Sequence, residues 1–107
     1  MSPTYAVKWR EPDGRTYLGR LSLTALALGL EGREQDGPPV SRLLVYDEIL
    51  RFRVGQRGDR LHGQTALVVE RADGRYLVTS AGVGAGIVQE VVDRLAAIRP
   101  AALRLDP

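Results

Sequence analysis

TALVVERADGRYLVTSAGVGAGIVQEVVDRLAAI, residues 65–98, is the stretch that decides the fold, because the spacing of its apolar residues changes once along it. Thr65–Glu70 and Arg75–Ser80 are short runs rich in valine, leucine, threonine and tyrosine, as strands usually are. Ala72-Asp73-Gly74 separates them, and Asp-Gly is a strong signal for a tight hairpin turn. The first half of the stretch therefore predicts two antiparallel strands.

The second half of the stretch predicts a helix. Its apolar residues recur at helical spacing, and its polar residues occupy the opposite face. Pro100 cannot continue a helix, so we expect a helix over about residues 84–99 and a short tail over 100–107. The residues expected to face the sheet are Ile87, Val91 and Leu95. The glycine-rich segment 81–86 is interpreted as a connector, because a dinucleotide-binding loop would need a βαβ unit around it.

Upstream of this stretch, alternating apolar and polar residues predict five more strands. Pro12-Asp13-Gly14 is turn chemistry and joins the first two strands into a hairpin. The residues expected on the buried face of the first three strands are Tyr5, Val7 and Trp9, then Tyr17, Gly19, Leu21 and Leu23, then Leu26, Leu28 and Leu30. Glycines and a Pro-Pro pair make residues 32–39 a loop.

The fourth and fifth strands are expected to meet at a bend. Residues 40–46 form the fourth strand, and Asp47-Glu48-Ile49 breaks the alternation, as a bend or β-bulge would. The fifth strand places Leu50, Phe52 and Val54 inward, and a polar loop over residues 56–63 follows it. The sequence thus predicts a mainly β protein: a bent, seven-stranded antiparallel sheet or partly open barrel, capped by one C-terminal helix.

Composition limits the classes of function. A chain of 107 residues is the size of a single domain, here 1–107. It has no cysteine and one histidine, so we expect no disulfide, no metal site and no cofactor. Basic residues are nearly balanced by acids and are spread along the chain, which argues against a nucleic-acid partner. The many Arg, Ala, Gly and Leu residues suggest a bacterial source.

The sequence carries no positive signal for a cellular location, so the expected location is the default one. The first residues lack the charged start and apolar run of a secretory leader. No apolar stretch reaches the roughly 20 residues that span a bilayer, so we expect no transmembrane segment. The expected location is therefore cytoplasmic.

Three segments carry a resemblance to a known superfamily. Gly19–Thr24, followed by the leucine-rich run, resembles an opening hairpin of that superfamily, and Tyr46-Asp47-Glu48-Ile49 resembles its strand-ending Asp-Ile step. Residues 65–80 resemble its last hairpin before the helix. In this order the segments resemble the pleckstrin-homology-like superfamily, in its bacterial, GRAM-like branch, over roughly residues 5–99. Its members are usually binding or scaffolding modules, so the resemblance implies no catalytic activity.

Two sets of surface residues are candidate binding sites. The phosphoinositide-binding branch uses a lysine near the end of the first strand and a basic step on the second. The matching residues are Lys8, Arg10, Arg15 and Arg20, although the final arginine of the step is missing and Glu11 and Asp13 would repel phosphate. The aromatic residues Tyr5, Trp9 and Tyr17 are expected to form core contacts or, if exposed, an interface anchor.

No group of residues predicts an enzyme. His62 lies in a polar loop without a serine near it in sequence, and adjacent residues such as Asp47 and Glu48 point to opposite faces of a strand. The leading hypothesis is therefore a non-catalytic binding or scaffolding module for a protein or peptide, which could be a second copy of itself. The alternative is recognition of an anionic lipid or phosphate by the basic strand face, with contact at a membrane surface.

Overall fold

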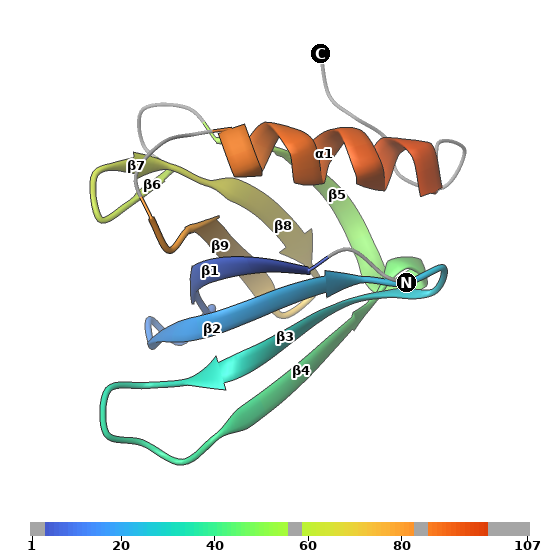
Figure 1. Ribbon diagram of the computed structural model, residues 1–107. Coiled ribbons are helices and arrows are strands. Elements are labelled where there is room, and N and C mark those ends of the chain that lie inside the picture. Colours follow the sequence, from blue (N-terminus) through green and yellow to red (C-terminus); the bar gives the residue numbers. More distant parts are fainter. Residues whose placement is uncertain (1–3, 56–58, 83–85, 99–107) are drawn as a thin grey trace.

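The computed structural model describes residues 4–55, 59–82 and 86–98. Seven of its strands form one antiparallel sheet, curled into a half-barrel, and a single helix follows at the C-terminal end (Figure 1). The strands of this sheet are β1 (Thr4–Arg10), β2 (Thr16–Leu23), β3 (Ala27–Arg33), β4 (Val40–Val45), β5 (Ile49–Val54), β8 (Leu67–Arg71) and β9 (Gly74–Ser80). The predicted fold class, a mainly β protein with a bent sheet and one C-terminal helix, is confirmed.

The order of strands across the sheet is β4-β3-β2-β1-β9-β8-β5. The first four strands form a meander, and β1 joins it to the last hairpin by pairing with both β2 and β9. Strands β4 and β5 are the two ends of the sheet, so the barrel is not closed by pairing between them.

The inward face of the sheet is the core. Side chains alternate along each strand, so Val7 and Trp9 of β1 point inward with Leu21 of β2 and Leu30 of β3, all nearly inaccessible to solvent. The sequence predicted this face for the first strand pair. Leu26 is an exception, because β3 begins one residue later, at Ala27, and Leu26 is exposed in the turn before it.

The helix α1 (Gly86–Ile98) lies across β5 and β9 (Figure 1). Val88, Val91, Val92 and Leu95 are buried, and Ile87 is partly buried against the core. The predicted amphipathic helix and its inward face are thus confirmed over residues 86–98, the part of the predicted range that the structure describes. Within the described residues, no helix is long and apolar enough to cross a membrane. Residues 83–85 of the glycine-rich connector and the predicted tail lie outside the described residues.

The bend between the fourth and fifth strands is a short 3-10 helix, Tyr46–Glu48. The Tyr46 hydroxyl donates to the Thr24 carbonyl at 2.8 Å and ties this bend to the β2–β3 turn. A β-bulge between Ile49 and Arg51 then shifts the register of β5 against β8. The prediction that Leu50 points inward is therefore wrong: Ile49 and Phe52 are buried, while Leu50 is exposed.

The predicted polar loop after β5 contains a small β-ribbon instead. Its strands are β6 (Arg60–Leu61) and β7 (Gln64–Thr65), which pair with each other in a separate two-stranded sheet. The ribbon covers part of the outward face of the main sheet and buries Leu61 completely. Val68 of β8, which points away from the main core, is buried as well. Outside the half-barrel there is thus a second, smaller apolar layer.

Candidate functional site

A hollow of about 620 Å³, the larger hollow, lies on the outward face beside the β6–β7 ribbon. Its floor is a row of three residues that face one another across three strands: Lys8 on β1, Leu18 on β2 and Arg33 on β3. Leu18 is 55% exposed, so an apolar side chain is accessible at the floor. The floor therefore offers an apolar contact between two cations.

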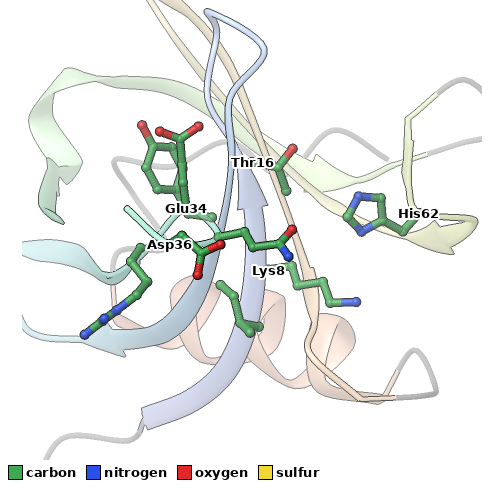
Figure 2. A pocket seen from close by; sticks show the side chains of 9 residues that line it. Lys8, Thr16, Glu34, Asp36 and His62 are labelled. Carbon is green, nitrogen blue, oxygen red and sulfur yellow. The ribbon is translucent and has the colours of Figure 1, made fainter. Parts of the chain in front are cut away.

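The walls of the larger hollow come from two connections (Figure 2). Glu34 and Asp36 of the β3–β4 connection stand on one side, and Gln35 of the same connection also lines the hollow. His62 of the β6–β7 turn stands on the other side, with Lys8 between them. The hollow thus combines cations, carboxylates, an amide and an apolar patch, a mixture that suits a polypeptide better than a purely anionic ligand.

Two wall residues have a left-handed backbone. Asp36 has φ 61° and His62 has φ 52°. His62 and the following Gly63, with φ 77°, form the two-residue turn of the ribbon, a geometry that requires positive φ at both positions. Asp and His adopt this conformation more readily than most residues. Both walls are therefore held by tight turns.

The aromatic residues do not form an exposed anchor. Trp9 and Tyr17 are buried and stack with ring centroids 5.1 Å apart, as directly paired residues of β1 and β2 can. Both side chains lie in the core, so the exposure that an interface anchor would require is not present. Tyr5 is half-buried and packs against the same core.

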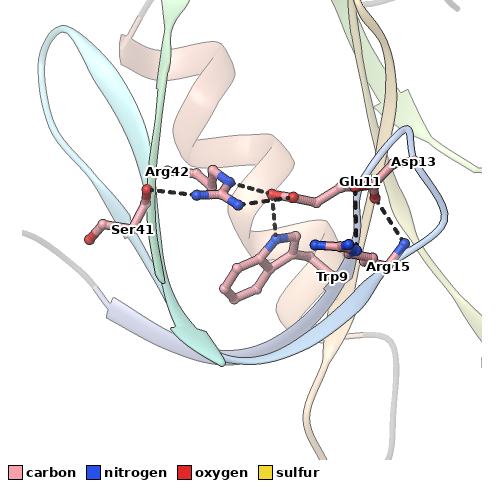
Figure 3. A network of polar contacts seen from close by, with 6 residues as sticks. All are labelled: Trp9, Glu11, Asp13, Arg15, Ser41 and Arg42. Atoms are coloured by element: carbon pink, nitrogen blue, oxygen red, sulfur yellow. Dashed lines mark hydrogen bonds and ion pairs between the residues drawn. The ribbon is translucent and has the colours of Figure 1, made fainter. Parts of the chain in front are cut away.

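A buried carboxylate, that of Glu11, lies between Trp9 and Arg42 (Figure 3). Glu11 is 8% exposed and accepts hydrogen bonds from Arg42 through Nε at 2.8 Å and Nη2 at 3.3 Å. The Trp9 indole donates to the same carboxylate at 3.4 Å. The hydrogen bond to Glu11 raises the pKa of Arg42, whose guanidinium also lies over the Tyr17 ring. Arg42 thus joins the end strand β4 to the β1–β2 turn.

A second buried carboxylate fixes the ribbon. Asp59 accepts hydrogen bonds from Arg53 of β5 at 2.8 Å and from Arg75 of β9 at 3.0 Å. Gly55 lies against this site: a side chain there would come within 2.6 Å of the Asp59 Cβ. The Gly55 amide donates to the Ala66 carbonyl at 2.7 Å. The chain therefore enters and leaves the ribbon through one tightly packed junction.

The four predicted basic residues do not converge on one site. Lys8 lines the larger hollow, and Arg20 lines a different hollow between β2, β3 and β4. Arg10 lines a third hollow at the β1–β2 and β8–β9 turns. Arg15 is 65% exposed and lies 3.8 Å from Asp13, while a hydrogen bond to Tyr17 and the charges of Glu34 and Asp13 raise its pKa.

Most residues of the hollows were missed by sequence reasoning. Arg33, Glu34 and Asp36 lie in what the sequence indicates only as a loop, and Arg60 and Arg75 lie on separate strands. One available signal was the His62-Gly63 pair, because Gly after a residue that tolerates positive φ is hairpin chemistry. Among the described residues, no group of three or more His, Asp or Glu side chains could hold a metal ion.

Comparison with known proteins supports the fold alone. No protein-family profile and no curated protein matches the chain. Among solved structures, the chain is similar to the C-terminal domain of an unknown protein from Leishmania infantum, with a TM-score of 0.64 and 13% sequence identity. The match covers 90% of this chain and 80% of the other. The fold of a curled sheet with a C-terminal helix is therefore one that another protein also adopts.

Proposed function

We propose that the protein is a non-catalytic binding module that holds an extended polypeptide segment in the larger hollow. The observation that carries the proposal is the row of Lys8, Leu18 and Arg33, walled by Glu34 and Asp36 on one side and His62 on the other. An extended peptide could place an apolar side chain on Leu18 and pair charges of both signs with the surroundings.

Two other positions for a peptide are less favourable. The space between α1 and the sheet is only about 10 Å³, so a peptide cannot enter there without moving the helix. The end strand β4 could accept an added strand, and its outward Leu43 is 67% exposed. However, the side-chain groups that would give specificity are gathered at the larger hollow, not along β4.

The order of strands supports a further part of the proposal, membership of the pleckstrin-homology-like superfamily. Seven antiparallel strands followed by one C-terminal helix is the order of elements in that superfamily, and the strands of the main sheet and α1 follow the same order along this chain. A bacterial, cytoplasmic protein is part of the same proposal. Its support is the arginine-rich composition and the absence of cysteine.

A peptide library displayed on phage tests the binding module directly. Peptides are selected on the wild-type protein and then measured against Leu18→Glu, which places a charge in the floor of the larger hollow. Leu50→Glu is the matched control, because Leu50 is also an exposed strand leucine, 68% accessible, but lies on β5. Leu43→Glu reports strand addition at β4.

The proposal predicts peptides that bind the wild type and both Leu50→Glu and Leu43→Glu, but lose at least about tenfold in affinity to Leu18→Glu. Peptides that bind all four proteins equally would contradict it. Loss of binding to Leu43→Glu alone would place the peptide site at β4. Failure to select any peptide would contradict the proposal that the protein is a peptide-binding module.

A further inference from the structure

The end strand β4 lacks the features that usually protect the edge of a sheet (Figure 1). Natural edges avoid pairing with another chain through lysines, prolines, β-bulges or coverage by another element. The sequence of β4, VSRLLV, has no lysine or proline, and its register against β3 is continuous. Its charged side chain, Arg42, is turned toward Glu11. Nothing in the strand itself therefore opposes the addition of another strand.

The opposite end of the sheet, β5, is protected. A β-bulge between Ile49 and Arg51 interrupts its register. Arg51 and Arg53 also place charges along it, in ion pairs with Glu70 and Asp59. Pairing of β4 with β5 of the next copy, which would build an open chain of copies, is therefore disfavoured. Pairing of β4 with β4 gives a closed dimer instead.

The register of β3 and β4 shows which backbone groups of β4 are turned outward. The Tyr46 amide donates to the Leu26 carbonyl at 3.0 Å, and this pair continues the register of the two strands. Hydrogen-bonded pairs alternate with non-bonded pairs in an antiparallel ladder, so the even-numbered residues of β4 are the ones that bond to β3. The backbone groups of Ser41, Leu43 and Val45 therefore point away from the sheet.

We propose that two copies of the protein associate by antiparallel pairing of their β4 strands, about a twofold axis at Leu43. In this register Leu43 faces Leu43 of the second copy, and Ser41 faces Val45 on both sides of the axis. Each of these pairs can exchange two hydrogen bonds. The Ser41 carbonyl, which accepts a bond from Arg42 at 3.3 Å, has a second lone pair for this purpose.

This register is favoured because it brings no like charges together. The outward row that crosses the axis consists of Gly29 and Leu43 from each copy, and the pairing covers Leu43, which is 67% exposed. A register centred one residue earlier would set Arg42 directly against its own copy. One centred two residues earlier would pair Leu43 with Pro39, which has no amide hydrogen. Later centres leave the start of β4 unpaired, because the strand ends at Val45.

Sedimentation velocity from about 10 µM to about 1 mM protein tests the dimer. Leu43→Glu places two carboxylates opposite each other at the axis. Ser41→Pro removes an outward amide hydrogen but keeps Leu43 and the bonds to β3. Leu50→Glu is the matched control, since Leu50 is an exposed leucine on β5. Thermal unfolding verifies that each variant folds.

The proposal predicts a dimer that forms as concentration rises, that is weakened at least about tenfold by Leu43→Glu and by Ser41→Pro, and that Leu50→Glu leaves unchanged. A wild type that stays monomeric at about 1 mM would leave this edge to a strand of another protein and would overturn the proposal. A dimer that survives both β4 variants would overturn it as well. Peptide binding at Leu18 is independent of this edge, so either proposal can fail without the other.

Disulfide formation tests the register separately. The chain has no cysteine, so one introduced cysteine reports its distance from its own copy. Leu43→Cys lies at the axis and should form the intersubunit disulfide at least about tenfold faster than Ser41→Cys or Leu50→Cys. The two copies of residue 41 would be about 14 Å apart along the paired strands, beyond the reach of a disulfide. Equal rates for the three variants would overturn this register.

Discussion

Replacing Asp59 by asparagine tests whether the outer ribbon is held by its buried carboxylate. The Asp59 side chain is 12% exposed and accepts bonds from two arginines at 2.8 and 3.0 Å. Asparagine keeps the shape and one acceptor but removes the charge. Arg53, which is 21% exposed, then loses its charged partner in a poorly solvated position.

The expected loss follows from the burial of this pair. Removing one partner of a buried ion pair costs about 3–5 kcal/mol. Because Arg75 is 55% exposed and can be hydrated instead, we expect a smaller loss of about 2–3 kcal/mol in the free energy of unfolding. For a domain of this size that loss corresponds to a fall in Tm of about 10–20 °C.

Urea unfolding followed by the fluorescence of Trp9, the single buried tryptophan, measures this loss. Asp13→Asn is the control, because Asp13 lies 3.8 Å from Arg15 in an exposed pair worth less than about 0.5 kcal/mol. If Asp59→Asn unfolds at the same urea concentration as Asp13→Asn, the ribbon is not held by this carboxylate and the reasoning fails.

Three further predictions concern the sheet and its charges. Gly19→Ala should destabilise by at least about 3 kcal/mol, because its new Cβ would lie within 3 Å of the β3 backbone, whereas Gly82→Ala meets no close neighbour. Glu11→Gln should lower the free energy of unfolding by about 1.5–3 kcal/mol, since a buried charged hydrogen bond is lost. Glu70→Gln should make the free energy of unfolding fall less as the pH is lowered, because Arg51 holds the pKa of Glu70 below its ordinary value in the wild type.

The sign of the last effect is fixed by the direction of that shift. A carboxyl with a lowered folded pKa stabilises the protein above the pKa of the unfolded chain, about 4.3, and loses this contribution as pH falls toward its folded value. Thermal unfolding between pH 6 and pH 3 measures it. If the stability of Glu70→Gln depends on pH as steeply as that of the wild type, the ion pair with Arg51 is contradicted. If Gly19→Ala and Gly82→Ala are equally stable, the close approach of β2 and β3 is contradicted.

The sequence was sufficient to predict the main sheet and the helix, because both depend on local periodicity. Val7 and Trp9, or Val91 and Leu95, have neighbours along the chain that reveal which face is buried. Leu50 was misplaced because the bulge at Ile49–Arg51 adds a residue to one strand, and that change of register arises from pairing with β8.

The hollows could not be predicted in the same way. Arg10 and Arg75 are far apart in sequence, and they line the same hollow only because β1 pairs with β9. Similarly, His62 reaches the larger hollow only because Asp59 and Leu61 fold the ribbon back over the outer face. Positions that depend on such long-range pairings leave no periodic pattern in the sequence.

The most direct test of the proposed function is to map a selected peptide onto the protein by NMR. Backbone amide signals of the described residues are compared with and without peptide. Peptide binding in the larger hollow predicts the strongest shifts at residues 16–18, 33–36 and 61–63. Strong shifts confined to β4, residues 40–45, with the Leu18 and His62 signals unchanged, would contradict this site.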